Sequence, residues 1–294
     1  MLAAIVIITL GAPDVGAIER AYAQWLDYKP VESGRISEDL AEVWNAPRMA
    51  GRQYSVMQPA SGEKVYLRFV QVATPADYVP MKTFGWNAVE ILVQDPDGLA
   101  KRLGDAKSPF RIVGVPRPLG PNSPIRAMQV VGPASEVLYL TRVPPEPGRH
   151  AAATYVDRPF IMIVGGADID AVRSFYSDVF KVPVSPANRA RMTVLNKAHG
   201  FDLETTHPLS MARLSDEYAI EIDGYPTSAT ERPIRPGELA PAIASVTFEV
   251  DSVEALELPL VAKARSINAF PYSGRRVGVA RGAAGELLEF ISRQ

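Results

Sequence analysis

The sequence contains no cysteine and only three histidines among its 294 residues. The absence of cysteine excludes disulfides, thiolate nucleophiles, cysteine-ligated zinc and iron–sulfur clusters. Neither sign of charge dominates, because 31 Lys and Arg stand against 33 Asp and Glu, so nucleic acid is not an expected partner. The sequence also lacks a glycine-rich phosphate loop and a Gly-x-Ser-x-Gly nucleophile elbow.

No hydrophobic run is long enough to span a bilayer. The most apolar segment is residues 1–10 (MLAAIVIITL), which lacks the positively charged start of a secretory signal. It is short, β-branched and closed by Gly11 and Pro13, and this pattern predicts a buried strand. With 47% hydrophobic and 22% charged residues, we expect a folded cytoplasmic protein without membrane contact.

Two segments far apart in the chain share one pattern. Residues 5–26 (IVIITLGAPDVGAIERAYAQWL) match residues 159–180 (PFIMIVGGADIDAVRSFYSDVF). Each reads as an apolar strand, an Asp at the helix N-cap and a helix with one apolar face. Identical residues at matched positions include Asp14 and Asp168, Ala17 and Ala171, and Tyr22 and Tyr176.

Two further matches extend the repeat. Residues 123–140 (SPIRAMQVVGPASEVLYL) match residues 273–290 (SGRRVGVARGAAGELLEF), and both predict a β-hairpin. Residues 86–103 match residues 243–260, and both predict an alternating strand, an acidic turn and a short helix. Identical pairs in the hairpins include Gly132 and Gly282, and Glu136 and Glu286.

The spacing of these matches is nearly constant, which indicates an internal duplication. Each half then contains two units, and each unit is a strand, a helix and about three more strands. We expect an N-terminal domain of paired units at 1–142, a linker at 143–157 and a C-terminal domain at 158–294. The predicted fold class is α+β: four βαβββ units in two similar halves, and we expect each half to form its own cupped mixed sheet with helices outside.

Paired βαβββ units resemble the vicinal oxygen chelate superfamily, which includes glyoxalase I, extradiol dioxygenases and bleomycin-resistance proteins. The resemblance is carried by DIDAVRSFYSDVFKVPV, TFEVDSVEAL and RGAAGELLEF, and by their first-half counterparts AIERAYAQWL, VEILVQDPDGLAKRL and VGPASEVLYL. It covers nearly the whole chain. It implies a half-open sheet that cups a ligand, usually beside a divalent metal held by His and Glu side chains.

Mapped onto this sequence, the family's metal positions are mostly not ligands. The closing-strand carboxylate falls on Glu289, and a further carboxylate falls on Glu221. The opening-strand histidine positions fall on Ile161 and Ser245. The first-half counterparts are Ile7, Arg68, Ala88 and Tyr139. Because imidazole ligands are missing, we expect no cofactor, and a divalent metal is disfavoured.

Four residues are the candidate catalytic groups. Glu289 and Glu221 lie inside apolar strands, where a carboxylate on the inner face can act as a general base with a raised pKa. The alternative is that both face solvent, because strand faces alternate. Arg68 can hold a carboxylate or phenolate, and Tyr139 can donate a hydrogen bond; otherwise they are a surface Arg and a packed Tyr.

Five further residues are candidate ligand contacts. Gln129 is a polar side chain in an apolar strand, whereas Trp86 and Tyr218 are either core or part of an aromatic pocket. His199 and His207 are candidate acid or base groups above such a pocket, or else loop residues.

These features support three functional hypotheses. The first is a metal-independent lyase or isomerase that acts on a small apolar or aromatic molecule, with Glu289 as the base and Arg68 or Tyr139 polarising the substrate. The second is a non-catalytic protein that sequesters such a molecule, as bleomycin-resistance proteins do. The third is a metal-dependent dioxygenase or lyase with a rearranged site. The sequence is compatible with a homodimer.

Overall fold

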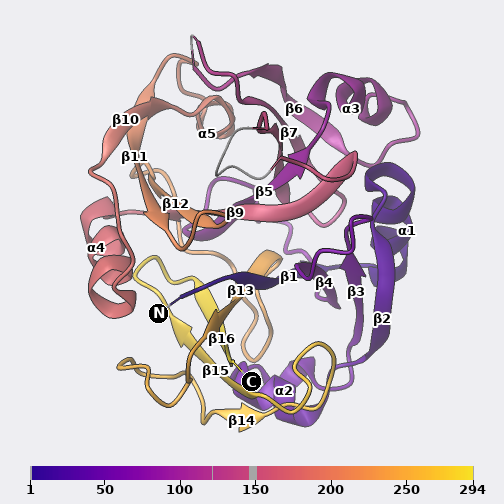
Figure 1. The fold of residues 1–294 in the computed structure, drawn as a ribbon, viewed down its shortest axis with the longest axis vertical. Helices are drawn as coiled ribbons and strands as arrows, with labels where there is room; N and C mark the ends of the chain where they lie inside the picture. The colour runs from indigo at the N-terminus through magenta and orange to yellow at the C-terminus, as the bar shows by residue number, and fades with distance from the viewer. Residues whose placement is uncertain (1, 121, 146–150, 294) are drawn as a thin grey trace.

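The computed structural model describes residues 2–120, 122–145 and 151–293, which form two eight-stranded mixed sheets (Figure 1). Sheet I has the spatial order β14-β15-β16-β13-β1-β4-β3-β2. Its strands are β1 (Ile5–Ala12), β2 (Lys29–Arg35), β3 (Gln53–Gln58), β4 (Tyr66–Gln71), β13 (Ala242–Val250), β14 (Arg265–Ser266), β15 (Arg276–Arg281) and β16 (Leu287–Ser292).

Sheet II has the spatial order β10-β11-β12-β9-β5-β8-β7-β6. Its strands are β5 (Gly85–Val93), β6 (Arg111–Pro118), β7 (Arg126–Val131), β8 (Val137–Arg142), β9 (Val156–Gly166), β10 (Asn188–Arg191), β11 (Thr206–Arg213) and β12 (Ala219–Gly224). The helices are α1 (Val15–Leu26), α2 (Glu38–Val43), α3 (Pro96–Leu103), α4 (Ile169–Ser174) and α5 (Thr193–His199), with a 3-10 turn η1 (Pro47–Met49) and a π-helical turn η2 (Phe175–Val179).

The predicted α+β fold of repeated units is confirmed, and the apolar N-terminal segment forms β1 as expected. The fourth unit departs from the pattern, because the helix expected after β13 is absent and residues 251–257 form turns. Pro259 interrupts that segment, and its neighbour Leu260 instead bridges to Ala280 of β15. Within the described ranges, every helix is too short or too polar to span a bilayer.

The pairing of the units differs from the expectation that each half forms its own sheet. Sheet I joins the first and fourth units through the antiparallel pair β1–β13, and sheet II joins the second and third through β5–β9. That expectation is wrong because all four opening strands are similarly apolar, so their sequences do not specify which two pair. The division of the chain into two domains, 1–142 and 158–294, stays a prediction.

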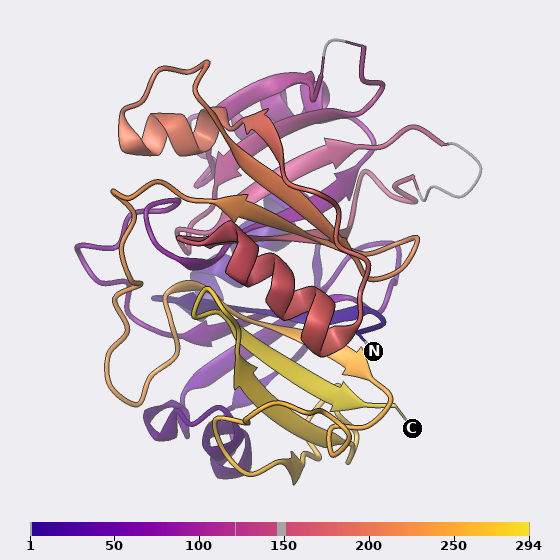
Figure 2. The same cartoon turned by 90° about the vertical axis from the view of Figure 1, so that its left-hand side faces the viewer.

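The two sheets pack back to back around the main core. Apolar side chains from the inner face of each sheet meet there, together with the buried faces of α1, α3 and α4. In Figures 1 and 2, α1 and α4 lie at opposite sides of this layer. Trp86 ties the sheets together, because its Nε1 donates to the carbonyl of Leu287 at 2.8 Å and its ring lies 6.2 Å from that of Phe248.

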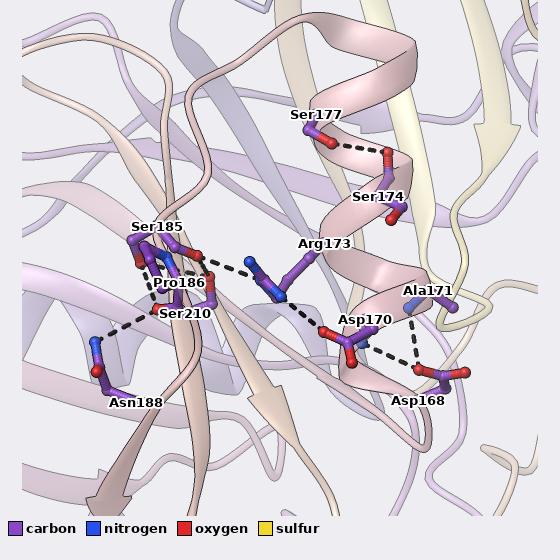
Figure 3. A network of polar contacts seen from close by, with 10 residues as sticks. All are labelled: Asp168, Asp170, Ala171, Arg173, Ser174, Ser177, Ser185, Pro186, Asn188 and Ser210. Atoms are coloured by element: carbon purple, nitrogen blue, oxygen red, sulfur yellow. Dashed lines mark hydrogen bonds and ion pairs between the residues drawn. The ribbon is translucent and has the colours of Figure 1, made fainter.

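The predicted Asp caps position α1 and α4, the equivalent helices of the first and third units. Asp14 accepts from the backbone N–H of Ala17 at 2.9 Å, and Asp168 accepts from Asp170 and Ala171 at 3.0 Å each. Figure 3 shows the second cap, with Arg173 of α4 reaching from Asp170 to the carbonyl of Ser185. Ser185 in turn hydrogen-bonds Ser210 of β11, so the helix is tied to its sheet.

A tyrosine–glutamate pair recurs in both halves. Tyr22 of α1 donates to Glu136 at 2.5 Å, and Tyr176 donates to Glu286 at 2.9 Å. Each bond connects a helix of one unit to the closing hairpin of the next. Burial raises the pKa of each glutamate to about 7. A side chain at Gly132 would place its Cβ only 1.9 Å from Glu136 Oε1, which explains the hairpin glycine.

Each sheet also has a concave face that points away from the main core. Apolar side chains around α2 and the segment before β15 cover this face of sheet I. The corresponding face of sheet II lies under α5 and residues near Met81. Figure 1 shows α2 and α5 at opposite ends of the molecule. The two concave faces are the places where the resemblance predicts a ligand.

Candidate functional site

The concave face of sheet I holds two of the four predicted catalytic residues in a sealed cluster. Arg68 of β4 is 1% exposed and Glu289 of β16 is 0% exposed, and their charged groups lie 3.5 Å apart. Glu289 also accepts from Trp44 at 2.5 Å and from Thr247 and Tyr272 at 2.6 Å each. These donors satisfy the carboxylate without any ligand.

The N–H donors of Arg68 are also occupied by protein groups. Its Nε and Nη2 donate to Thr9 at 3.1 and 2.7 Å, and its Nη1 donates to Tyr272 at 2.5 Å. The guanidinium lies 4.8 Å from the ring centroid of Trp44. Burial by itself lowers the pKa of Arg68, but Tyr272 and Glu289 raise it overall. The structure therefore brings the predicted Arg68 and Glu289 together, in a place that solvent does not reach.

The concave face of sheet II gathers the other predicted catalytic residues. Tyr139 of β8 and Glu221 of β12 are both partly exposed. The strand register places Glu90 between Tyr139 and Ile161, and it places Glu221 beside Ile163. Paired residues point to the same face of a sheet, so these polar groups share one concave surface.

Two acidic residues that the sequence analysis did not select complete this cluster. Asp223 lies two residues after Glu221 on the same strand face and is 2% exposed. Glu90 is 5% exposed and accepts from Thr141 Oγ1 at 2.5 Å. The available signal was an acidic residue within an apolar strand, WNAVEILV for Glu90, and the i, i+2 spacing for Asp223.

Burial and mutual repulsion make these carboxyl groups hold protons. Burial, Asp223 and Glu90 raise the pKa of Glu221 well above 4.5, and burial raises that of Asp223 to about 8. Burial also raises the pKa of Glu90 to about 7, against the effect of the Thr141 hydrogen bond. The pKa of Tyr139 rises well above 10 through burial and through the nearby carboxyl groups. The cluster therefore exchanges protons near neutral pH.

Two cavities lie on this side of sheet II. One, of about 320 Å³, lies between α5, residues 79–81 and the sheet, where Val131 and Val137 contribute to its wall. The other, of about 480 Å³, reaches Ile161 and Met211, which pair directly with Glu90 and Glu221. The acidic residues line neither cavity themselves, but their strand neighbours line the larger one, and both cavities have a size suited to a small molecule.

The remaining predicted ligand contacts lie in different places. Trp86 is in the core between the sheets, and it borders neither cavity. Tyr218 lines the larger cavity, and Gln129 lies beside Tyr139 against Gly114 of β6, with no partner for its Oε1 among the described residues.

The two histidines support the covering segment over sheet II. His199 is within hydrogen-bond distance of the Met81 carbonyl (3.1 Å) and Ser228 Oγ (2.8 Å), and His207 contacts Asn196 Oδ1 at 2.7 Å. Burial lowers the pKa of both rings, which favours their neutral form. Their contacts fix α5 and its neighbouring loops. His150 lies outside the described residues.

The donor sets of the two concave faces do not fit the metal that this fold usually carries. On sheet I, the guanidinium of Arg68 would repel a divalent cation beside Glu289. On sheet II, the corresponding positions offer Glu221 and Tyr139 but apolar Ala88 and Ile161. Across the part of the chain that the structure describes, no three His, Asp or Glu side chains are grouped to hold a metal.

Comparison with known proteins supports the fold. No protein-family model and no curated protein sequence matches the chain. Among solved structures, glyoxalase I from Zea mays aligns with a TM-score of 0.65 and 12% identity, over 98% of this chain and 92% of that one. A "putative dioxygenase" from Bacillus subtilis aligns with a TM-score of 0.60 and 13% identity, over 99% and 85%. The chain therefore has the vicinal oxygen chelate fold, which the residue patterns of its repeated units predicted.

Proposed function

We propose that the concave face of sheet II binds a small apolar or aromatic molecule and catalyses its isomerisation by proton transfer, without a metal. The observation that carries the proposal is the Glu221–Asp223 carboxyl pair, which faces Tyr139 near two cavities with mixed polar and apolar walls. Groups whose pKa lies near the working pH are suited to general acid–base catalysis. Solvent does not reach the sealed Arg68–Glu289 cluster, so a substrate has no access to it. We therefore assign the base to the Glu221–Asp223 pair rather than to Glu289.

The chemistry needs only the groups present. The ionised carboxyl pair takes a proton from a carbon next to a carbonyl, and the electron pair of that C–H bond moves to form an enolate. Tyr139 donates a hydrogen bond to the enolate oxygen, where charge develops. The pair then returns the proton to another carbon of the same molecule, so atoms and charge balance. A lyase reaction would differ in one step, because a leaving group would depart from the enolate.

Solvent exchange tests the proposal whatever the product of the reaction is. Thermal-shift screening with aromatic acids, phenols and enones identifies ligands, which are then incubated with the protein in D₂O. We expect proton NMR to show deuterium entering a carbon next to a carbonyl. Glu221→Gln should slow this exchange by about 100-fold or more while ligand binding persists.

Two control variants sharpen the comparison. Glu32→Gln changes an exposed carboxylate on β2 and should leave exchange unchanged. Glu289→Gln should lower stability and leave exchange by the folded protein intact. Equal exchange by wild type and Glu221→Gln would refute the assignment. Tight binding by wild type with no exchange and no turnover would instead support a sequestering protein.

A further inference from the structure

Arg158 is a buried cation that lines the cavity of about 480 Å³ beside sheet II. It follows the start of β9, and only 4% of its surface is exposed. Its Nη2 donates to Glu217 at 3.1 Å, and its guanidinium lies 4.8 Å from the ring centroid of Tyr218. Its Nη1 has no hydrogen-bond partner among the residues that the structure describes. An unsatisfied donor of this kind costs free energy unless another group occupies it.

The surroundings of Arg158 have the form of a binding site. Arg158 and Tyr218 line the cavity of about 480 Å³ whose apolar wall includes Ile161 and Met211. The planar guanidinium is held between the carboxylate of Glu217 and the Tyr218 ring, so the direction of Nη1 is fixed. Nη1 itself is buried, so a ligand oxygen would reach it only after a shift of the side chains around the cavity, without displacing the Glu217 contact of the guanidinium.

The charge of the site favours a carboxylate as the occupant. The cavity wall carries Arg158 and Arg213 and also the acidic Asp216 and Glu217. The summed charge is therefore balanced, and selectivity must come from the directed donor rather than from a general positive potential. A charge-assisted hydrogen bond is about twice as strong as a neutral one, so an ionised oxygen is the preferred acceptor.

We infer that Arg158 binds the carboxylate of an aromatic or apolar carboxylic acid whose body lies along β9 towards Glu221. The inference rests on the proposed function for the location of the reacting end. Arg158 and Ile163 are five positions apart on β9, and Ile163 pairs with Glu221 on the neighbouring strand. Arg158 and the Ile163–Glu221 pair therefore lie about 16 Å apart along the strand. A ligand that contacts both Arg158 and Glu221 therefore has to cover most of this distance along the strand.

Calorimetric titration with 3-phenylpropanoate and its neutral analogue 3-phenylpropanamide tests the inference. We expect wild type to bind the acid about tenfold more tightly than the amide. Arg158→Met keeps a long apolar side chain on Tyr218, and it should reduce acid affinity by about tenfold with amide affinity unchanged. Arg158→Lys should retain part of the preference for the acid, because it keeps the charge.

Two further variants provide matched comparisons. Arg213→Met removes the other cation of the cavity wall, which is exposed, and should change acid affinity less than threefold. Glu217→Gln removes a competing negative charge and should strengthen acid binding. Equal affinity of wild type for acid and amide, or equal losses of both in Arg158→Met, would overturn the inference.

The experiments distinguish a failure of this inference from a failure of the proposed function. Acid selectivity at Arg158 is a binding property, so Glu221→Gln should preserve it. Loss of deuterium exchange in Glu221→Gln without any acid preference would retain the function and reject the carboxylate site. Acid preference with unchanged exchange in Glu221→Gln would do the reverse.

Discussion

The Glu136–Tyr22 and Glu286–Tyr176 pairs should make the fold less stable as pH rises. Each glutamate has its pKa raised from 4.5 to about 7 by burial, so the folded state binds more protons than the unfolded state between these values. The stabilisation is complete below about pH 4.5 and is lost as pH rises through about 7. Because one pKa unit corresponds to about 1.36 kcal/mol, each glutamate accounts for about 3 kcal/mol.

Glu136→Gln isolates one of these contributions. Glutamine is nearly isosteric with the protonated acid and cannot ionise, so the variant should lose its share of the pH dependence. Urea unfolding at pH 5 and pH 8 measures the free energy of unfolding of wild type and variant. The variant should gain about 2–3 kcal/mol relative to wild type between these two values. The contributions of the other buried carboxyl groups to the free energy of unfolding are the same in both proteins, so they cancel in this difference.

A parallel decline of stability in wild type and Glu136→Gln would refute this reasoning, as would wild-type stability that rises from pH 5 to pH 8. Glu286→Gln is the matched variant in the other half, and the same pair geometry predicts a similar effect. Tyr22→Phe removes the hydrogen-bond donor but leaves the carboxyl group buried. It should therefore lower stability at both pH values and keep the decline with pH.

Three further predictions follow from other buried contacts. Arg68→Met leaves Glu289 buried without its cation and should cost about 3–5 kcal/mol in urea unfolding; a cost below about 1 kcal/mol would contradict the sealed ion pair. Gly132→Ala places a Cβ 1.9 Å from Glu136 Oε1 and should cost about 1–3 kcal/mol by the same assay, with a much smaller cost in a Glu136→Ala background. Deuterium exchange should rise about tenfold per pH unit below pH 8 and level off above it, because the ionised pair is the base and the pKa of Asp223 is about 8; a constant rate from pH 6 to pH 9 would contradict this assignment.

Residue patterns predicted the repeated units because local chemistry specifies them. Asp14 and Asp168 cap helices through bonds to the next few residues, and those contacts depend only on neighbours in the chain. The matching Tyr22 and Tyr176 then have equivalent partners in Glu136 and Glu286. The association of the first unit with the fourth depends instead on contacts between strands far apart in sequence. Four similar opening strands do not encode that choice separately.

The candidate site was also predicted only in part: local sequence indicated the positions of its residues but not their accessibility. The positions of Tyr139 and Glu221 at the closing strands follow from the repeat, and they do share one concave face. Accessibility did not follow from the pattern, because Arg68 and Glu289 occupy equivalent positions and yet are sealed by Trp44 and its neighbours. Each concave face is covered by a helix between the second and third strands of a unit, α2 in sheet I and α5 in sheet II, and the side chains of these two helices differ.

The account rests on sheet II, rather than sheet I, being the working face. A crystal structure with a bound aromatic carboxylic acid from the screen tests this most directly. We predict ligand density along β9, with its carboxylate at Arg158 Nη1 and its other end between Tyr139 and Glu221. Density beside Arg68 and Glu289, with α2 displaced, would contradict the account.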